Sequence, residues 1–358
     1  MKLPLSFVLL AAVSNLCPGQ TDQAQQDARL LADSLGAFTA RLVANDKAQD
    51  NLCLSPASAG IAMLMAYAGA SGETAEALAN MLAPEGWDAD RIHAAAAALD
   101  ARLQRDTDGF QLANQQDVWS QSGYPLLASY RKVMRDSYHA SFESLDFDKN
   151  PDAARKFINR QISRKTQGLI EELLQPGMVS RATRLILTNT LYLNAKWQHQ
   201  FDANDTYSRN FTLPGGKNKL VKSMFAEASF PALQQQGRQV VRLAYQGGDF
   251  ALDLVLPANT DDLPEALAML LTSNGEDWQK KLTDERLRLW LPRFSIQTHE
   301  SLIQRMGDSA LPLGAGADFS KATSDPRGLF ISEIIQATSI DVAEQGTRAA
   351  AATAVLLV

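Results

Sequence analysis

The chain has 358 residues, of which 46% are hydrophobic and 21% are charged, with 14 prolines spread along it. This composition is typical of a globular protein with a large core, arranged as one large domain or two ordinary ones. The formal net charge of −6 argues against nucleic acids and heparin-like polyanions as partners.

The N-terminal residues, 1–19, have the pattern of a secretory signal peptide. Lys2 precedes an apolar run over residues 3–13, and small and polar residues follow. The run is too short to span a bilayer. We therefore expect a signal peptide at residues 1–19 and a secreted, extracellular protein, or a periplasmic one if the source is bacterial. No membrane association is expected.

The N-terminal third of the chain predicts helices. Apolar residues at helical spacing predict a helix over residues 22–46. Residues 51–58 are expected to form a short strand that breaks into a helix at Pro56, because proline suits the first helical turn. Residues 61–68 are apolar on nearly all sides and predict a buried helix. A further helix is expected over residues 90–105, whose mixed charges indicate a solvated face rather than a polyanion site.

Cys53 is expected to be the single cysteine of the mature chain, because Cys17 leaves with the signal peptide. A structural disulfide is therefore not expected. A lone cysteine could act as a nucleophile. Since Cys53 lies between Leu52 and Leu54, we instead predict a small core residue.

The second half of the chain predicts strands. Residues 185–193 are mostly apolar and rich in residues that favour strands. Residues 211–224 supply two short strands around a turn at residues 214–217. Residues 240–245 and 250–256 are expected to form a hairpin across two glycines.

The C-terminal residues, 344–358, admit two interpretations. Their alanines favour helix, so one interpretation is a helical or disordered tail. With a period of two, Arg348 lies on one face and only small or apolar side chains lie on the other. A strand of this kind can enter between two existing strands without burying a charge. The uncharged face consists of Thr347, Ala349, Ala351, Thr353, Val355 and Leu357.

The sequence lacks the spacings of common catalytic and metal-binding motifs. None of its four histidines belongs to a His-x-x-x-His or Glu-x-x-His pattern. Residues 69–72 do not form a nucleophile elbow, and residues 215–217 lack the spacing of a phosphate loop. His299 lies in a polar segment, and we expect it to be exposed to solvent rather than catalytic. We expect neither an enzyme nor a bound cofactor or metal.

Several stretches of the sequence resemble the serpin family of protease inhibitors. The pattern Asn-x-x-x-Ser-Pro-x-Ser at residues 51–58 leads to Gly-x-x-Gly-Glu-Thr at residues 69–74. The more specific Thr-Asn-Thr-Leu-Tyr-Leu-Asn-Ala-Lys-Trp occupies residues 188–197. Residues 328–347 resemble the strand and hinge that carry the reactive loop. The resemblance extends from about residue 32 to the last residue and indicates a single domain over residues 20–358.

The resemblance implies an α+β fold with three β-sheets and about eight or nine helices. A helix in the region 157–174 would lie across the large central sheet, which is able to accept the reactive loop as an extra strand. The resemblance also implies a monomer that inhibits a serine or cysteine endopeptidase. The protease cuts the loop, forms an acyl-enzyme and is carried along as the loop inserts. The alternative is a non-inhibitory serpin that acts as a carrier or chaperone.

By the family's pattern, the cut bond lies beyond Val358. We therefore expect the chain to lack the segment C-terminal to the cut site, either as the large piece of a cleaved molecule or through truncation. A loop without that tether can satisfy its backbone groups by insertion. Residues 347–357 are therefore expected as an antiparallel strand between residues 185–194 and 330–343.

The resemblance also implies three groups of functional residues. The shutter of the family usually includes a histidine, and Gln336 takes its place here; since glutamine cannot become charged, a pH-dependent shutter is not expected. Apart from any family role, Glu344 and Arg293 would form a surface ion pair worth less than about 1 kcal/mol. The three groups are a reactive-loop hinge of Glu344, Gly346, Thr347, Arg348, Ala349, Ala350, Ala351, Ala352 and Thr353, a breach of Trp197, Arg293 and Glu344, and a shutter of Ser55, Ser58, Asn189 and Gln336.

Overall fold

The computed structural model describes residues 22–44, 51–213, 217–235, 237–257, 278–307, 316–325 and 327–358. The signal peptide expected at residues 1–19 lies outside these ranges. Among the described helices, none is long and apolar enough to cross a membrane.

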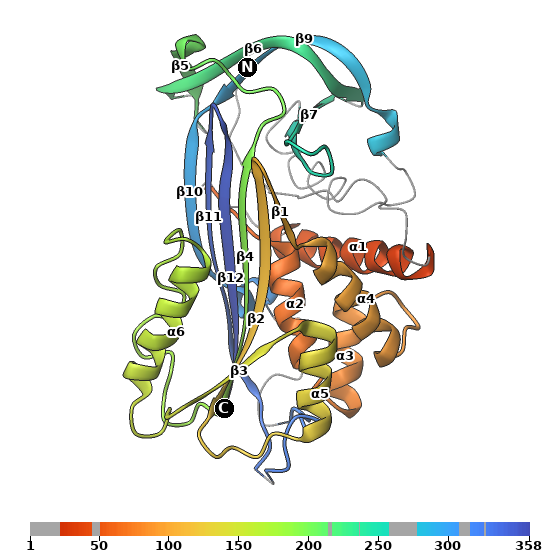
Figure 1. Cartoon of the computed structure of the whole chain (residues 1–358), viewed down its shortest axis with the longest axis vertical. Helices are drawn as coiled ribbons and strands as arrows, with labels where there is room; N and C mark the ends of the chain where they lie inside the picture. The colour runs from red at the N-terminus through yellow and green to blue at the C-terminus, as the bar shows by residue number, and fades with distance from the viewer. Residues whose placement is uncertain are drawn as a thin grey trace.

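A large, mostly antiparallel sheet of seven strands runs through the length of the molecule (Figure 1). Its strand order is β1-β2-β4-β12-β11-β10, with β3 paired in parallel to β2. The neighbours β4 and β12 come from distant parts of the sequence, so the sheet joins the two halves of the chain. Its strands are β1 (Arg105–Thr107), β2 (Phe110–Gln121), β3 (Ser141–Leu145), β4 (Leu185–Lys196), β10 (Phe294–Ser301), β11 (Ile331–Ala343) and β12 (Gly346–Leu357).

Helices cover the two faces of this sheet unequally. In Figure 1, α6 lies on one face, and α1 to α5 lie on the other. The apolar helix α2 packs against β4 and β12, as the buried run in the sequence predicted. The α-helices are α1 (Asp22–Ala44), α2 (Pro56–Tyr67), α3 (Gly72–Leu82), α4 (Ala89–Arg102), α5 (Ala128–Tyr138), α6 (Pro151–Lys165) and α8 (Leu302–Met306), and short 3-10 helices are η1 (Ala203–Asp205) and η4 (Trp278–Lys281).

A second sheet of five strands lies at one end of the large sheet (Figure 1, top). Its strands are β5 (Thr206–Thr212), β6 (Asn218–Gln235), β7 (Arg238–Ala244), β8 (Ala251–Leu256) and β9 (Thr283–Pro292). The long strand β6 pairs with β5 at its start, with β9 along its middle and with β7 at its end. The described strands outside the large sheet therefore form one sheet, where the resemblance implied two. The described residues also contain seven α-helices, compared with the eight or nine expected.

Residues 51–55 precede α2 but do not form the expected strand. They do not pair with a neighbouring strand. Instead, the hydroxyls of Thr298 and Thr338, on the large sheet, donate to the carbonyl of Cys53 at 2.7 and 2.9 Å. Ser55 is the N-cap of α2, and the proline after it lies in the first turn, as predicted. Cys53 is buried and free, which confirms its prediction as a core residue. Burial raises the pKa of its thiol, so it is a poor nucleophile.

His93, on α4, is enclosed by aromatic rings. Its ring lies 5.5 Å from that of Tyr67 and 5.7 Å from that of Tyr138, and burial lowers its pKa from 6.5 to about 4. The unfolded chain binds the proton first as the pH falls, so the stability present above pH 6.5 is lost between pH 6.5 and 4. Between pH 7 and pH 5, urea unfolding should show a loss about 2 kcal/mol larger for the wild type than for His93→Leu. Equal losses in the two proteins would assign the acid sensitivity to other groups.

Candidate functional site

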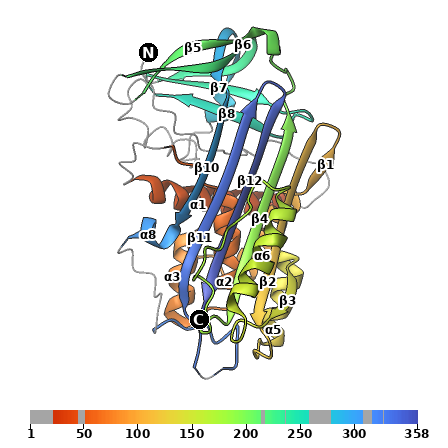
Figure 2. The ribbon, with the colours of Figure 1, turned by 90° about the vertical axis from the view of Figure 1, so that its left-hand side faces the viewer.

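The C-terminal strand β12 lies between β4 and β11 and pairs antiparallel with both (Figure 2). The pairing runs from Gly346, opposite Lys196 and Ala343, to Leu357 at the other end of the sheet. Both edges of the strand therefore find backbone partners. The inserted strand predicted between residues 185–194 and 330–343 is confirmed.

Both faces of β12 are buried, although only one was predicted to be. On the predicted face, Thr347, Thr353 and Val355 are at most 1% exposed, and Arg348 on the other face is exposed. Beyond Arg348, the second face lies under α6 and the chain that follows it. The sequence held one sign that this second face is buried, because no charged residue follows Arg348. The buried residues of this second face are Ala350, Ala352, Ala354 and Leu356.

Gly346 lies closer to β4 than a residue with a side chain could. An added Cβ would lie 2.0 Å from the carbonyl oxygen of Ala195 and 2.8 Å from the Cα of Lys196. The turn itself is made by Glu344 and Gln345, between β11 and β12. Glycine is therefore required here by the close approach of two backbones and not by the turn.

The three breach residues lie together at the start of β12. The indole Nε1 of Trp197 donates to the carbonyl of Ala343 at 2.9 Å, and Nη1 of Arg293 lies 3.6 Å from Oε1 of Glu344. Because the Arg293 side chain is 53% exposed, this ion pair contributes little stability. The mostly buried carboxylate of Glu344 also accepts a hydrogen bond from the hydroxyl of Thr206 at 2.9 Å. The indole and the threonine thus hold the turn more firmly than the arginine does.

Tyr245 is a further member of this region that no sequence pattern indicated. Its ring stacks on that of Trp197 with the centroids 4.8 Å apart, and its hydroxyl donates to Oγ1 of Thr347 at 2.8 Å. Burial raises the pKa of its phenol, so the hydroxyl stays protonated and can donate. Tyr245 therefore binds the first buried side chain of β12.

Gln336 joins the start of α2 to the middle of β12. Its Oε1 accepts from the N–H of Ser55 at 2.9 Å, and its Nε2 donates to the carbonyl of Ser55 at 3.0 Å and to the hydroxyl of Thr353 at 2.9 Å. The hydroxyl of Ser58 lies 2.9 Å from that of Thr353. Thr353, assigned to the hinge from the sequence, thus completes a buried cluster with Ser55, Ser58 and Gln336.

Asn189, the fourth shutter residue, does not bond to this cluster, although it faces Thr353 across the pairing of β4 and β12. Its Nδ2 donates to Oδ1 of Asn114 at 2.7 Å, and Asn114 donates in turn to the buried carboxylate of Asp100 at 2.7 Å. Among the described residues, its own Oδ1 has no hydrogen-bond partner. Gln336 and Ser58 already form hydrogen bonds with the Thr353 hydroxyl. Asn189 therefore belongs to a second polar group, with Asn114 of β2 and Asp100 of α4.

Replacing Gln336 with leucine is expected to lower the free energy of unfolding by about 2–3 kcal/mol. The change removes the acceptor of the Ser55 N–H and a donor to Thr353, and a buried group left without its partner costs its full desolvation. Urea unfolding measures the effect. The matched control is Ser339→Ala on the same strand, because this hydroxyl is buried without a hydrogen-bond partner among the described residues. A similar loss in both variants would contradict the role of Gln336.

Comparison with known proteins identifies similar chains. A family model described as "Serpin (serine protease inhibitor)" matches residues 32–358. Serpin B6 of Macaca fascicularis is 31% identical over 341 residues, which cover 92% of this chain and 89% of that protein. The leukocyte elastase inhibitor of Bos taurus is 31% identical over 322 residues, which cover 85% of this chain and 82% of that protein. A solved structure described as "Cleaved Serpin 42Da" has a TM-score of 0.85 and 26% identity, and the match covers 92% of this chain and 90% of that one.

Proposed function

Because this chain belongs to the serpin family, we propose that it inhibits a serine or cysteine endopeptidase by trapping it covalently while β12 enters the large sheet. The matching family model is described as a serine protease inhibitor and a relative is named an elastase inhibitor; serpins are not enzymes, and this chain is not an enzyme. The residues between the Glu344–Gln345 turn and the end of β12 take the role of the reactive loop.

In this mechanism the serine hydroxyl or cysteine thiol of the protease attacks a peptide carbonyl of the loop. The carbon–nitrogen bond breaks, the amine leaves with a proton supplied by the protease, and an ester or thioester joins the loop to the enzyme. Water would then hydrolyse this acyl-enzyme. Trapping requires insertion to be faster than hydrolysis, so β12 must enter the sheet without a slow step such as the burial of a charge.

The observation that carries the proposal is the complete fit of β12 in the sheet. The strand has 12 residues, and its side chains from residue 349 to residue 357 are all buried. At about 0.5–1.5 kcal/mol net for each ladder hydrogen bond, insertion gains on the order of 10 kcal/mol before apolar burial is counted. An insertion energy of this size supports a mechanism in which the loop enters the sheet after it is cut and stays inserted.

The test is to mix the protein, expressed from its complete reading frame, with serine and cysteine proteases of different specificity and to analyse the mixtures on SDS gels. Trapping predicts a band that survives SDS and boiling and has the combined mass of protease and inhibitor. If every protease that cuts the loop leaves no such band, the proposal fails. That result would favour a non-inhibitory serpin that acts as a carrier or chaperone.

We further propose that the target protease prefers small aliphatic residues. Residues 354–358 offer only alanine, valine and leucine near the expected cut site, and one relative is named a leukocyte elastase inhibitor. An elastase-type protease is therefore the first to test. Mass spectrometry of the cleaved protein should place the cut after a small aliphatic residue, and a cut after arginine or lysine would contradict this specificity.

We also propose that the protein is exported and acts as a monomer, without heparin or nucleic acid as a partner. The signal-like pattern of residues 1–19 supports export, and the net charge of −6 argues against polyanions. N-terminal sequencing of the exported protein should show a start near residue 20, and size-exclusion chromatography should give the mass of one chain. An intact N-terminus in the cytoplasmic fraction alone would contradict export.

A further inference from the structure

The chain that follows α6, residues 166–184, runs over the outer face of the large sheet before it enters β4, and it is named the return segment here. Its apolar side chains pack with those of α6 on the outer face of β12 and β11. The return segment therefore covers the inserted strand. Its buried apolar residues are Ile170, Leu173, Leu174 and Val179.

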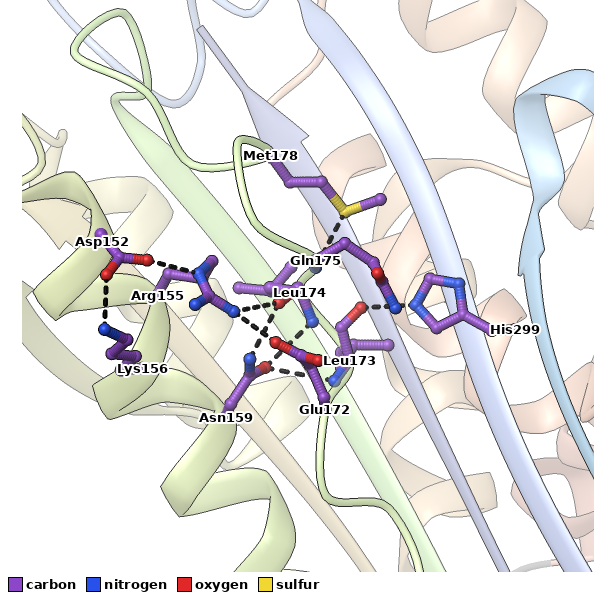
Figure 3. Close-up of polar contacts among 10 residues, drawn as sticks. All are labelled: Asp152, Arg155, Lys156, Asn159, Glu172, Leu173, Leu174, Gln175, Met178 and His299. Atoms are coloured by element: carbon purple, nitrogen blue, oxygen red, sulfur yellow. Dashed lines mark hydrogen bonds and ion pairs between the residues drawn. The ribbon is translucent and has the colours of Figure 1, made fainter.

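Two buried side chains of α6 hold the return segment (Figure 3). Asn159 Oδ1 accepts from the N–H groups of Leu173 and Leu174 at 3.2 and 2.9 Å, and Asn159 Nδ2 donates to the carbonyl of Leu174 at 2.8 Å. Arg155 donates to that carbonyl at 3.0 Å and to the carboxylate of Glu172 at 2.5 Å. Asn159 and Arg155 are each 6% exposed. These contacts fix the middle of the return segment to α6.

A buried ion pair in turn fixes α6 to β2. Lys165 Nζ, at the C-terminal end of α6, lies 2.6 Å from both carboxylate oxygens of Asp117 on β2. The side chains of Asp117 and Lys165 are 3% and 21% exposed, so the carboxylate is buried and the pair is mostly shielded from solvent. Since the return segment also continues directly into β4, α6 and the return segment are attached to the β2–β4 side of the sheet.

On the far side of β12, His299 of β10 binds the same part of the return segment (Figure 3). Its Nε2 lies 2.7 Å from the carbonyl oxygen of Leu173, and because a carbonyl can only accept, Nε2 donates. His299 is exposed, as the sequence predicted, and it still makes this hydrogen bond. Leu173 is thus bound at its N–H by α6 and at its carbonyl by β10.

The spacing of the sheet makes this contact depend on insertion. β4 and β10 are separated by β12 and β11, and neighbouring strands lie about 4.8 Å apart. Without β12, β10 would lie about 4.8 Å nearer to β4 and to the return segment attached to it. Hydrogen-bond distances vary over only about 0.5 Å. The contact between His299 and Leu173 therefore fits the sheet that contains β12 and not the sheet without it.

We propose that His299 is a positioning residue that latches the return segment over β12 once the strand has inserted, and so opposes its withdrawal. The proposal rests on the proposed function, because it requires a form in which β12 lies outside the sheet. The latch acts through Leu173 and not on the protease. It operates in neutral and protonated histidine, because the imidazolium also donates from Nε2.

Hydrogen–deuterium exchange on the 358-residue chain, in which β12 is inserted, is the first test. His299→Leu should speed the exchange of residues 169–179 about 3- to 10-fold, the factor expected for the loss of one hydrogen bond, and leave β6 and β9 unchanged. His299→Gln, which retains an amide donor, should recover most of the protection. Gln297→Leu is the matched control on the same face of β10, where an exposed side chain is replaced, and should have no effect.

The second test compares the two states of the protein. In the uncut protein from the complete reading frame, His299→Leu should leave the exchange of residues 169–179 unchanged. Equal acceleration in both states, or none in the inserted state, would overturn the latch. Protease trapping is scored separately as the SDS-resistant band, so failure of the latch and failure of the proposed function give different results.

Discussion

Under the proposed function, replacing Thr347 with arginine should change the protein from an inhibitor into a substrate. Thr347 is the first buried residue of β12, at 1% exposure, and its hydroxyl accepts a hydrogen bond from Tyr245 at 2.8 Å. A guanidinium at this position would be buried beside a neutral phenol, which costs about 3–5 kcal/mol. If that cost falls on the first step of insertion, insertion slows by more than about 100-fold. Hydrolysis of the acyl-enzyme should then release the protease.

The measurement for Thr347→Arg is the number of inhibitor molecules consumed for each protease inhibited, together with the SDS-resistant band. We expect the number to rise sharply and the band to disappear. Gln345→Arg is the matched control, because it adds the same charge at an exposed position in the turn. It should inhibit normally. Normal inhibition by Thr347→Arg itself would refute the assignment of the hinge.

Gly346→Val should prevent the start of β12 from pairing with β4. The added Cβ would lie 2.0 Å from the carbonyl oxygen of Ala195, and that oxygen belongs to the backbone of a central strand that is paired on both sides. In the 358-residue chain, we expect the free energy of unfolding to fall by about 3 kcal/mol or more, at the upper end of the cost of overpacking. Urea unfolding measures this loss, and hydrogen exchange should show faster exchange at residues 347–349.

The control for this prediction is Gly316→Val. No described atom lies within 4 Å of a Cβ added at Gly316, so a side chain there has room. We expect a change in stability well below that of Gly346→Val. If the two variants lose the same stability, the close approach of β12 to β4 is not the reason for the glycine at position 346.

The fold could be predicted from the sequence because its signatures lie in short continuous stretches. The serpin fold implied by residues 51–58, 69–74 and 188–197 is confirmed by the family match over residues 32–358 and by the related structure. The helical spacing near the N-terminus predicted α1, which is described from Asp22 to Ala44. The prediction of a strand before α2 was wrong, because the carbonyl of Cys53 accepts hydrogen bonds from threonine side chains of β10 and β11 and these residues pair with no neighbouring strand.

The candidate site could be predicted only in part. The resemblance placed Trp197, Arg293 and Glu344 in one group, and the structure brings them together. It also placed Asn189 with Gln336, and the structure separates them. Tyr245 and His299 had no sequence signal, since the residues that they bind, Thr347 and Leu173, are more than 100 positions away in the chain.

The sequence by itself determined that residues 347–357 have one uncharged face when they are extended, because the alternation of side chains is a property of the extended backbone. The family resemblance then favoured this strand over a helical tail, and the structure confirms it. Only the tertiary structure decided that the second face is also buried, because this depends on α6 and the return segment lying across it. The tertiary structure likewise decided why position 346 is glycine, since the 2.0 Å approach to Ala195 is a distance between two strands. Distances of this kind arise when separate elements pack together, and no local pattern of residues contains them.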